Sequence, residues 1–168
     1  MLQVIQRLID PTFSEQSHGF MPNRRSHDAV LAAQLFVQLG KRIMVNGVVL
    51  NRKEDIPQGG PLSPLLANIM LDEVDKELEK RGYNFARYAD DCNVYASSRK
   101  SGERVMALLK QRYAKLRLKI NESKSAVASV FGRTFLGYSL WVCPGGAIKR
   151  RVADKASKAY KQRVRQLT

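Results

Sequence analysis

The stretch from residue 84 to residue 96 constrains the fold of this chain more than any other. It reads Asn-Phe-Ala-Arg-Tyr-Ala-Asp-Asp-Cys-Asn-Val-Tyr-Ala, so two β-prone runs, one ending at Tyr88 and one starting at Cys92, flank a short turn. The turn carries adjacent acids, Asp90 and Asp91, which a β-hairpin would place at one edge of a sheet. Because like charges repel, a divalent cation beside the two carboxylates would favour the pair. A solvated Asp-Asp turn is the alternative, since Asp is common in turns.

Charge indicates the class of partner. The chain has 168 residues, the size of one ordinary domain, and 29 Lys and Arg against 15 Asp and Glu give a net charge of +14. A balance this basic favours a polyanion, with nucleic acid ahead of an anionic membrane surface. No apolar run approaches the roughly 18 residues of a transmembrane helix, so we expect no membrane role. Cys92 and Cys143 have neither metal-site nor disulfide spacing, which fits a cytoplasmic location.

The last twenty residues carry half of the net charge, with eight cations against one acid. The cations are Lys149, Arg150, Arg151, Lys155, Lys158, Lys161, Arg163 and Arg165. Ala156, Tyr160 and Val164 recur at near-helical spacing, which predicts a helix with one basic side. These cations are candidate nucleic-acid-binding residues, and a solvated helix face is the alternative.

Apolar periodicity predicts three further helices, from Ser26 to about Leu39, from Ser63 to about Arg81, and from Ser101 to about Leu118. In the second helix, Ser63-Pro64 reads as N-cap and first helical residue. Its expected buried stripe consists of Leu66, Ile69, Met70, Val74 and Leu78, and its charged side is expected to be exposed.

Turn signals predict two more β features. Asn46-Gly47 lies between β-prone runs and is the strongest short hairpin signal, so we expect a hairpin from Arg42 to about Asn51. Phe135 to Val142 reads as one strand that the Pro144-Gly-Gly turn brings back towards Ile148.

Five motifs occur in an order that resembles the palm of a reverse transcriptase, and more narrowly the group II intron-encoded reverse transcriptase/maturase family. They are Gly19-Phe-Met-Pro-Asn-Arg24, Pro57-Gln-Gly-Gly-Pro-Leu-Ser-Pro64, Tyr88-Ala-Asp-Asp91, Asn121-Glu-Ser-Lys124-Ser and Phe135-Leu-Gly-Tyr138. The resemblance covers nearly the whole chain. It implies an α+β fold, a partial palm of antiparallel sheet and packed helices with remnants of the fingers. Residues 1–148 would form this part, and residues 149–168 the basic start of the thumb or maturase region.

The resemblance also implies roles for residues. Asp90 and Asp91 would be catalytic and would bind Mg²⁺, or Mn²⁺ in its place. Nucleotide-binding residues would be Arg24 near the phosphates, Gln58, Gly59 and Gly60 at the floor of the pocket, and Lys124 as the positive charge that closes the palm. The implied partners are RNA as template or intron, a DNA primer and deoxynucleoside triphosphates.

The chain departs from the family at two motifs, and Arg25, which stands where serine is usual in the fingertip motif, is the smaller departure. The family carries a metal-bridging aspartate in an Asp-x-x-x-Phe-Phe-Asp strand between the fingertip and Pro-Gln-Gly motifs, whereas only 39 positions separate Gly19 from Gln58 here. No aspartate of the chain has that context, and we expect Asp72 and Asp75 on the exposed side of their helix. We therefore expect a missing block between Ala33 and Gly40, together with the N-terminal fingers and most of the thumb. Its loss would leave the Asp90–Asp91 hairpin with an open apolar edge, which favours a dimer or a complementing fragment.

Three functions stay open on the sequence. The first is an RNA-directed DNA polymerase that transfers nucleotides with two divalent metals and is linked to intron splicing and mobility. The second is a catalytically defective protein that retains only maturase-like RNA binding. The third and weakest is another palm-like nucleotidyl enzyme such as a cyclase, against which the Pro-Gln-Gly loop and the basic tail count.

Overall fold

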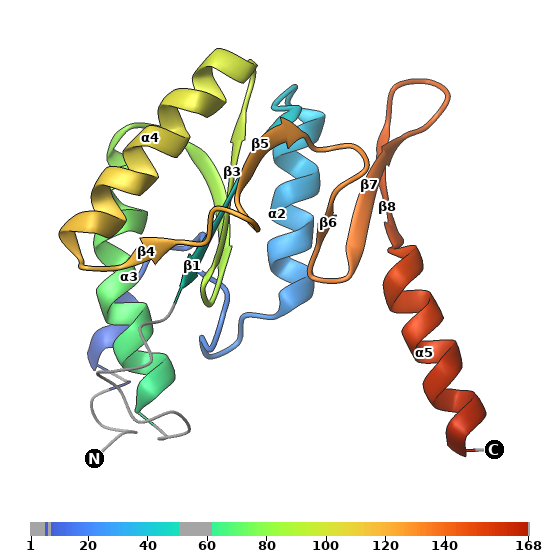
Figure 1. The fold of residues 1–168 in the computed structure, drawn as a ribbon, viewed down its shortest axis with the longest axis horizontal. Helices are drawn as coiled ribbons and strands as arrows, with labels where there is room; N and C mark the ends of the chain where they lie inside the picture. The colour runs from blue at the N-terminus through green and yellow to red at the C-terminus, as the bar shows by residue number, and fades with distance from the viewer. Residues whose placement is uncertain (1–5, 7, 51–61, 168) are drawn as a thin grey trace.

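A computed structural model of the protein describes residues 6, 8–50 and 62–167, and an antiparallel sheet lies at its centre (Figure 1). In the described part, the strands run in the order β2 (Asn84–Tyr88), β3 (Asp91–Ala96) and β1 (Ile43–Leu50). The other edge of β1 pairs with β5 (Ala126–Ser129) and then with β4 (Lys119–Ile120). All of these pairs are antiparallel. Because β1 pairs with β3 on one edge and with β5 and β4 on the other, it is the central strand that connects the two halves of the sheet.

Helices cover both faces of this sheet. On one side lies α2 (Ser26–Gln38), and on the other lie α3 (Ser63–Lys80) and α4 (Arg99–Lys115) (Figure 1). Beside α2, a second small sheet consists of β6 (Thr134–Phe135), β7 (Tyr138–Val142) and β8 (Ile148–Val152). A short 3-10 turn, η1 (Asp10–Thr12), lies near the start of the chain, and α5 (Asp154–Leu167) extends away from the rest (Figure 1). The predicted α+β class is confirmed.

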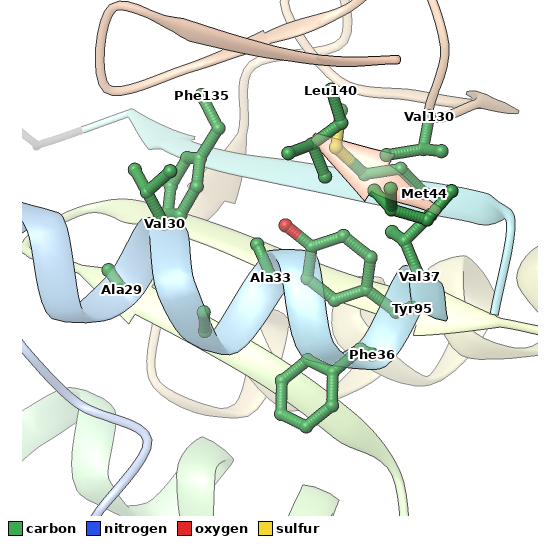
Figure 2. Close-up of a cluster of buried hydrophobic side chains, with 12 residues drawn as sticks. Ala29, Val30, Ala33, Phe36, Val37, Met44, Tyr95, Val130, Phe135 and Leu140 are labelled. Atoms are coloured by element: carbon green, nitrogen blue, oxygen red, sulfur yellow. The ribbon is translucent and has the colours of Figure 1, made fainter. Parts of the chain in front are cut away.

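One core lies between α2, the sheet and the small sheet. Figure 2 shows α2 contributing Ala29, Val30, Ala33, Phe36 and Val37, the central sheet Met44 and Tyr95, and the following segments Val130, Phe135 and Leu140. Phe36 and Tyr95 meet with ring centroids 5.6 Å apart. Burying each large apolar side chain stabilises the fold by about 1.5–3 kcal/mol, so this core fixes α2 and the small sheet against the hairpin.

A second core fills the opposite face. Leu71, Val74 and Leu78 of α3 and Val105, Leu109 and Tyr113 of α4 pack on Val45, Phe85, Cys92 and Val94 of the sheet. Alternate residues of β3 therefore serve different cores, Tyr95 the α2 face and Val94 the α3–α4 face.

The predicted hairpin turn at Asn46-Gly47 is wrong, because both residues lie inside the continuous strand β1. Asn46 pairs with Asn93 and Gly47 with Cys92 of β3. A two-residue hairpin turn of this composition needs positive φ, and neither residue has it. A Cβ at Gly47 would lie 3.1 Å from Leu109 Cδ1, so glycine here lets α4 approach the sheet. Burial between two strands overrides the local turn preference.

The expected open edge of the Asp90–Asp91 hairpin is also wrong. β3 lies between β2 and β1, and the register places Asp91 opposite Val48. On the outer edge, β2 meets residues 16–18 through a bridge between Ser17 and Arg87. The helix α2 continues to Gln38, through most of the range where a missing block is expected, and the next strand, β1, lies beside the hairpin.

Two further element predictions need correction. Phe135 to Val142 is not one strand but the β6–β7 hairpin, with Leu136 and Gly137 in its turn at φ of 50° and 81°. Glycine is favoured at position 137 because of its positive φ and not because of crowding, since the nearest atom to an added Cβ, on Ala156, lies 3.8 Å away. The basic tail is helical only from Asp154, because Lys149 to Arg151 belong to β8.

The orientation of α3 differs from the predicted stripe. Val74 and Leu78 are buried as predicted, but Leu66, Ile69 and Met70 are exposed. Asp72 and Asp75, predicted to be exposed, are buried. The N-cap is Leu62, one residue before the predicted Ser63. The helix is rotated because Asn68 and Asp75, two turns apart on one face, bind a buried arginine of β2.

Candidate active site

The predicted acidic turn is present at the tip of the β2–β3 hairpin. Tyr88 pairs with Asp91, which is the first residue of β3, and Ala89 and Asp90 form the turn between them. Ala89 has a φ of 54°, in the left-handed region that favours glycine. Asp90 is exposed and Asp91 half-buried. The hairpin therefore brings together two carboxylates with different access to solvent.

Asp91 is surrounded by amides on the α2 face of the sheet. Asn46 of β1 donates from Nδ2 to Asp91 Oδ1 at 3.3 Å and to Asn93 Oδ1 at 2.8 Å. Burial raises the pKa of the Asp91 carboxyl above its usual value; the Asn46 hydrogen bond and the charge of Lys124 lower it, and the charge of Asp90 raises it further. Asn46 Oδ1 and the Nδ2 of the fully buried Asn93 have no hydrogen-bond partner in the described part of the chain.

Asp90 and Asp91 are the two neighbouring carboxylates that a cation at this turn would bind. Residues 8–50 and 62–167 hold no group of three or more His, Cys, Asp or Glu side chains suited to a metal ion. The side chain that reaches Asp91 from the neighbouring strand is a neutral amide, that of Asn46. A cation on Asp90 and Asp91 would keep several waters, and it would supply Lewis-acid stabilisation of phosphate charge.

Of the other predicted nucleotide-binding residues, the structure describes Arg24 and Lys124. Arg24 donates from Nη1 to the carbonyl of Ser14 and, at 2.6 Å, to that of Ser17, so its guanidinium holds its own loop together. Lys124 lies in the turn before β5, where its backbone N–H donates to the Asn121 carbonyl. The positive charge of Lys124 lowers the pKa of Asp91. Gln58, Gly59 and Gly60 lie outside the described residues. These nucleotide-binding assignments stay predictions.

The predicted nucleic-acid-binding cations occupy two elements. Lys149, Arg150 and Arg151 lie on β8, and the other five lie along α5, and all eight are exposed. Arg150 donates to Gln34 Oε1 of α2 at 3.1 Å, and Arg151 donates to Ser139 Oγ at 3.4 Å. A groove of about 360 Å³ beside β7 is lined by Phe131, Trp141, Arg151 and Lys155 among others. Cationic and aromatic groups therefore share this surface.

Three residues behind the turn escaped the sequence reasoning. Arg87 of β2 is 1% exposed and donates to both oxygens of Asp75 at 2.9 Å from Nε, and again at 2.7 Å from Nη2. Its Nη1 donates to Asn68 Oδ1 at 2.9 Å and to the Ala89 carbonyl at 3.0 Å. The available signal was the seven-residue spacing of Asn68 and Asp75, which aligns two polar residues on one helix face.

Comparison with known proteins identifies the family. Residues 42–140, more than half of the chain, match the family described as reverse transcriptase (RNA-dependent DNA polymerase). The chain belongs to the reverse transcriptase family. The matched range contains the whole Asp90–Asp91 hairpin and Lys124, and it excludes Arg24 and the basic tail.

A relative gives the same family. The retron Ec86 reverse transcriptase of Escherichia coli is 30% identical over 101 residues, which cover 56% of this chain and 32% of that protein. The chain thus matches about a third of the length of this reverse transcriptase. None of the helices in the described ranges is long and apolar enough to span a membrane.

Proposed function

We propose that this reverse transcriptase family member is, by lineage, an RNA-directed DNA polymerase of the group II intron type. We further propose that the 168-residue chain itself binds RNA and a divalent cation without extending a primer. One observation carries the second part: the side chain facing Asp91 from β1 is the neutral amide of Asn46. The order of the five sequence motifs supports the group II assignment, with its link to intron splicing and mobility.

The chemistry follows from the charges at the turn. Polymerisation is phosphoryl transfer in which two Mg²⁺ ions stabilise the attacking primer hydroxyl and the leaving pyrophosphate. Asp90 and Asp91 would hold one cation, and Lys124 would balance phosphate charge beside them. Arg24 would reach a nucleotide only after leaving the carbonyls of Ser14 and Ser17. With a neutral Asn46, the described part of the site lacks the shared carboxylate that would keep two cations together.

RNA binding is assigned to the small sheet and α5. Trp141 is 43% exposed and pairs across the strands with Lys149, and Arg151 and Lys155 line the same groove. An exposed aromatic ring beside cations is typical of sites that stack single-stranded bases and follow the phosphate backbone. The partner is therefore RNA read mainly through its phosphates, with little sequence preference.

Primer extension tests the catalytic part. On an RNA template with a DNA primer, Mg²⁺ and deoxynucleoside triphosphates, the chain should give no product above background. Templated extension that Asp90→Asn abolishes would contradict this and would mean that another acid completes the site.

Salt dependence tests the RNA-binding part. If the tail neutralises about five phosphates of single-stranded RNA, log affinity should fall with log salt at a slope of roughly −3 to −4. Replacing the five α5 cations with Gln should flatten this slope, whereas Arg99→Gln and Arg104→Gln, on the distant helix α4, should not. An affinity independent of salt would reject the proposal.

A further inference from the structure

Arg87 links three parts of the chain that are far apart in sequence. Its guanidinium bonds Asp75 and Asn68 of α3 and the carbonyl of Ala89 in the acidic turn. Asn68 in turn donates from Nδ2 to the Gly19 carbonyl at 2.9 Å. The backbone of Arg87 continues the link, since its N–H donates to the Gln16 carbonyl at 2.9 Å and its carbonyl accepts from the His18 N–H at 2.8 Å. Every side-chain nitrogen of Arg87 thus has a partner.

A buried ion pair of this kind is not needed for stability alone. Desolvating two charges costs about as much as their attraction returns, and apolar replacements of buried pairs are often neutral or stabilising. Burial by itself lowers the pKa of the Arg87 guanidinium, but the Asp75 carboxylate raises it above its ordinary value. The geometry of the network therefore points to a role beyond holding α3 on the sheet.

The turn that Arg87 contacts is strained and tightly confined. Ala89 has a left-handed backbone, which is unfavourable for a residue with a Cβ unless its surroundings impose it. Gly19 packs directly on this residue, because a Cβ at Gly19 would lie 2.2 Å from the Ala89 nitrogen. The Ala89 carbonyl accepts a hydrogen bond from Arg87. The next two residues are Asp90 and Asp91, so the backbone conformation of Ala89 sets the orientation of both acids.

We propose that Arg87 is a positioning residue for the two acids. With Asp75 and Asn68 it holds the Ala89 carbonyl, and it thereby fixes how the turn presents Asp90 and Asp91 to a cation. The inference rests on the proposed function in taking these carboxylates as cation ligands. Lysine cannot replace arginine here, because a single ammonium cannot reach Asp75, Asn68 and Ala89 in the fixed planar arrangement of a guanidinium.

The first measurement needs no metal. The Cα and Cβ chemical shifts of Ala89 report its left-handed backbone, and Arg87→Lys and Asn68→Ala should both move them towards ordinary turn values. Arg112→Met is the matched control, because Arg112 pairs with Glu77 of α3 at 2.7 Å without touching the turn. The control should leave the Ala89 shifts in place. Unchanged shifts in both Arg87→Lys and Asn68→Ala would overturn the inference.

The second measurement is Mn²⁺ binding, followed by broadening of the amide signals from Tyr88 to Cys92. Arg87→Lys should weaken binding about tenfold or more, the usual cost of losing a group that orients metal ligands. Adding Ala89→Gly should restore part of the affinity, since glycine adopts positive φ without strain, and it should not restore the melting temperature. Equal affinity in the parent and Arg87→Lys would count against positioning. A parent that does not bind Mn²⁺ would refute the cation part of the proposed function, and the Ala89 shifts alone would then decide the role of Arg87.

Discussion

The two faces of the β2–β3 hairpin differ in whether their buried polar groups have hydrogen-bond partners. On the α3 face, Arg87 donates to Asp75, Asn68 and Ala89, and no nitrogen of its guanidinium is left over. On the α2 face, Asn93 is buried and Asn46 half-buried, yet each keeps one buried polar atom without a partner in the described residues. Buried unpaired polar atoms are costly. The comparison teaches that the Arg87 network is satisfied as it stands, whereas the Asn46–Asn93 pair would gain from a change in charge.

Breaking the Arg87 network on the α3 face should have the largest effect on stability. Arg87→Met leaves the Asp75 carboxylate buried with no cation, and it should lower the free energy of unfolding by about 3–5 kcal/mol. Urea unfolding followed by circular dichroism measures this. The double variant Arg87→Met with Asp75→Leu should recover most of the loss, because both charges are then removed. A double variant as unstable as the single one would show that hydrogen bonds to Asn68 and Ala89 carry the effect.

Changing the charge beside Asp91 on the α2 face should have the next largest effect. Asn46→Asp places a carboxylate against Asp91, so it should tighten Mn²⁺ binding about tenfold to a hundredfold and lower stability in the absence of metal. Asn93 could turn its amide and donate its unpaired Nδ2 to the new carboxylate. Calorimetric titration of Mn²⁺ gives the affinity, with Asn46→Ala as the control that removes the amide without adding charge. Parent-like affinity in Asn46→Asp would mean that Asp91 is not a cation ligand.

His18 has a satisfied backbone N–H but a ring with no hydrogen-bond partner among the described residues, and replacing it should give a smaller effect on stability that depends on pH. Its backbone N–H bonds Arg87, whereas both ring nitrogens are buried without a partner in the described part of the chain. Burial, and then the charge of Arg24, lowers the pKa of His18 below 6.5. The unfolded chain therefore takes up the proton first, so stability is full above pH 6.5 and falls as the pH drops below it.

Urea unfolding between pH 8 and pH 5 tests this dependence. His18→Gln should remove much of the decline below pH 6.5, and His27→Gln should not, because His27 is an exposed histidine of the same segment that bonds Tyr138. Identical pH profiles for the two variants would contradict the burial argument.

The smallest effect concerns access to the α3–α4 face. Burial raises the pKa of the Cys92 thiol to about 12, so at pH 8 it should resist alkylation until the protein unfolds. Cys143, in the partly exposed β7–β8 turn, should react first. Mass spectrometry after brief iodoacetamide treatment distinguishes the two sites. Equal labelling would show that this face opens in the native state.

The sequence predicted elements whose signals are local. The acidic hairpin, the three helices before the tail and the helix of the tail itself all follow from periodicity and turn residues, and the family match agrees with the palm-like reading. It missed what depends on partners distant in the chain. Asn46-Gly47 reads as a turn until β3 and β5 pair with it on both sides. Asp75 reads as a solvated helix residue until Arg87 is placed opposite, and no local pattern contains that pairing.

The position of β1 also sets an order for the making of this protein. Ile43 pairs with Ala96 on one side and with Ser129 on the other, so the central strand is synthesised well before either neighbour exists. Contacts this distant in sequence close slowly, and an unpaired strand invites association with other chains in the meantime. A nascent chain that stops before Ala126 therefore still has one edge of its central strand open. During translation, β1 is the segment that a chaperone would have most reason to hold.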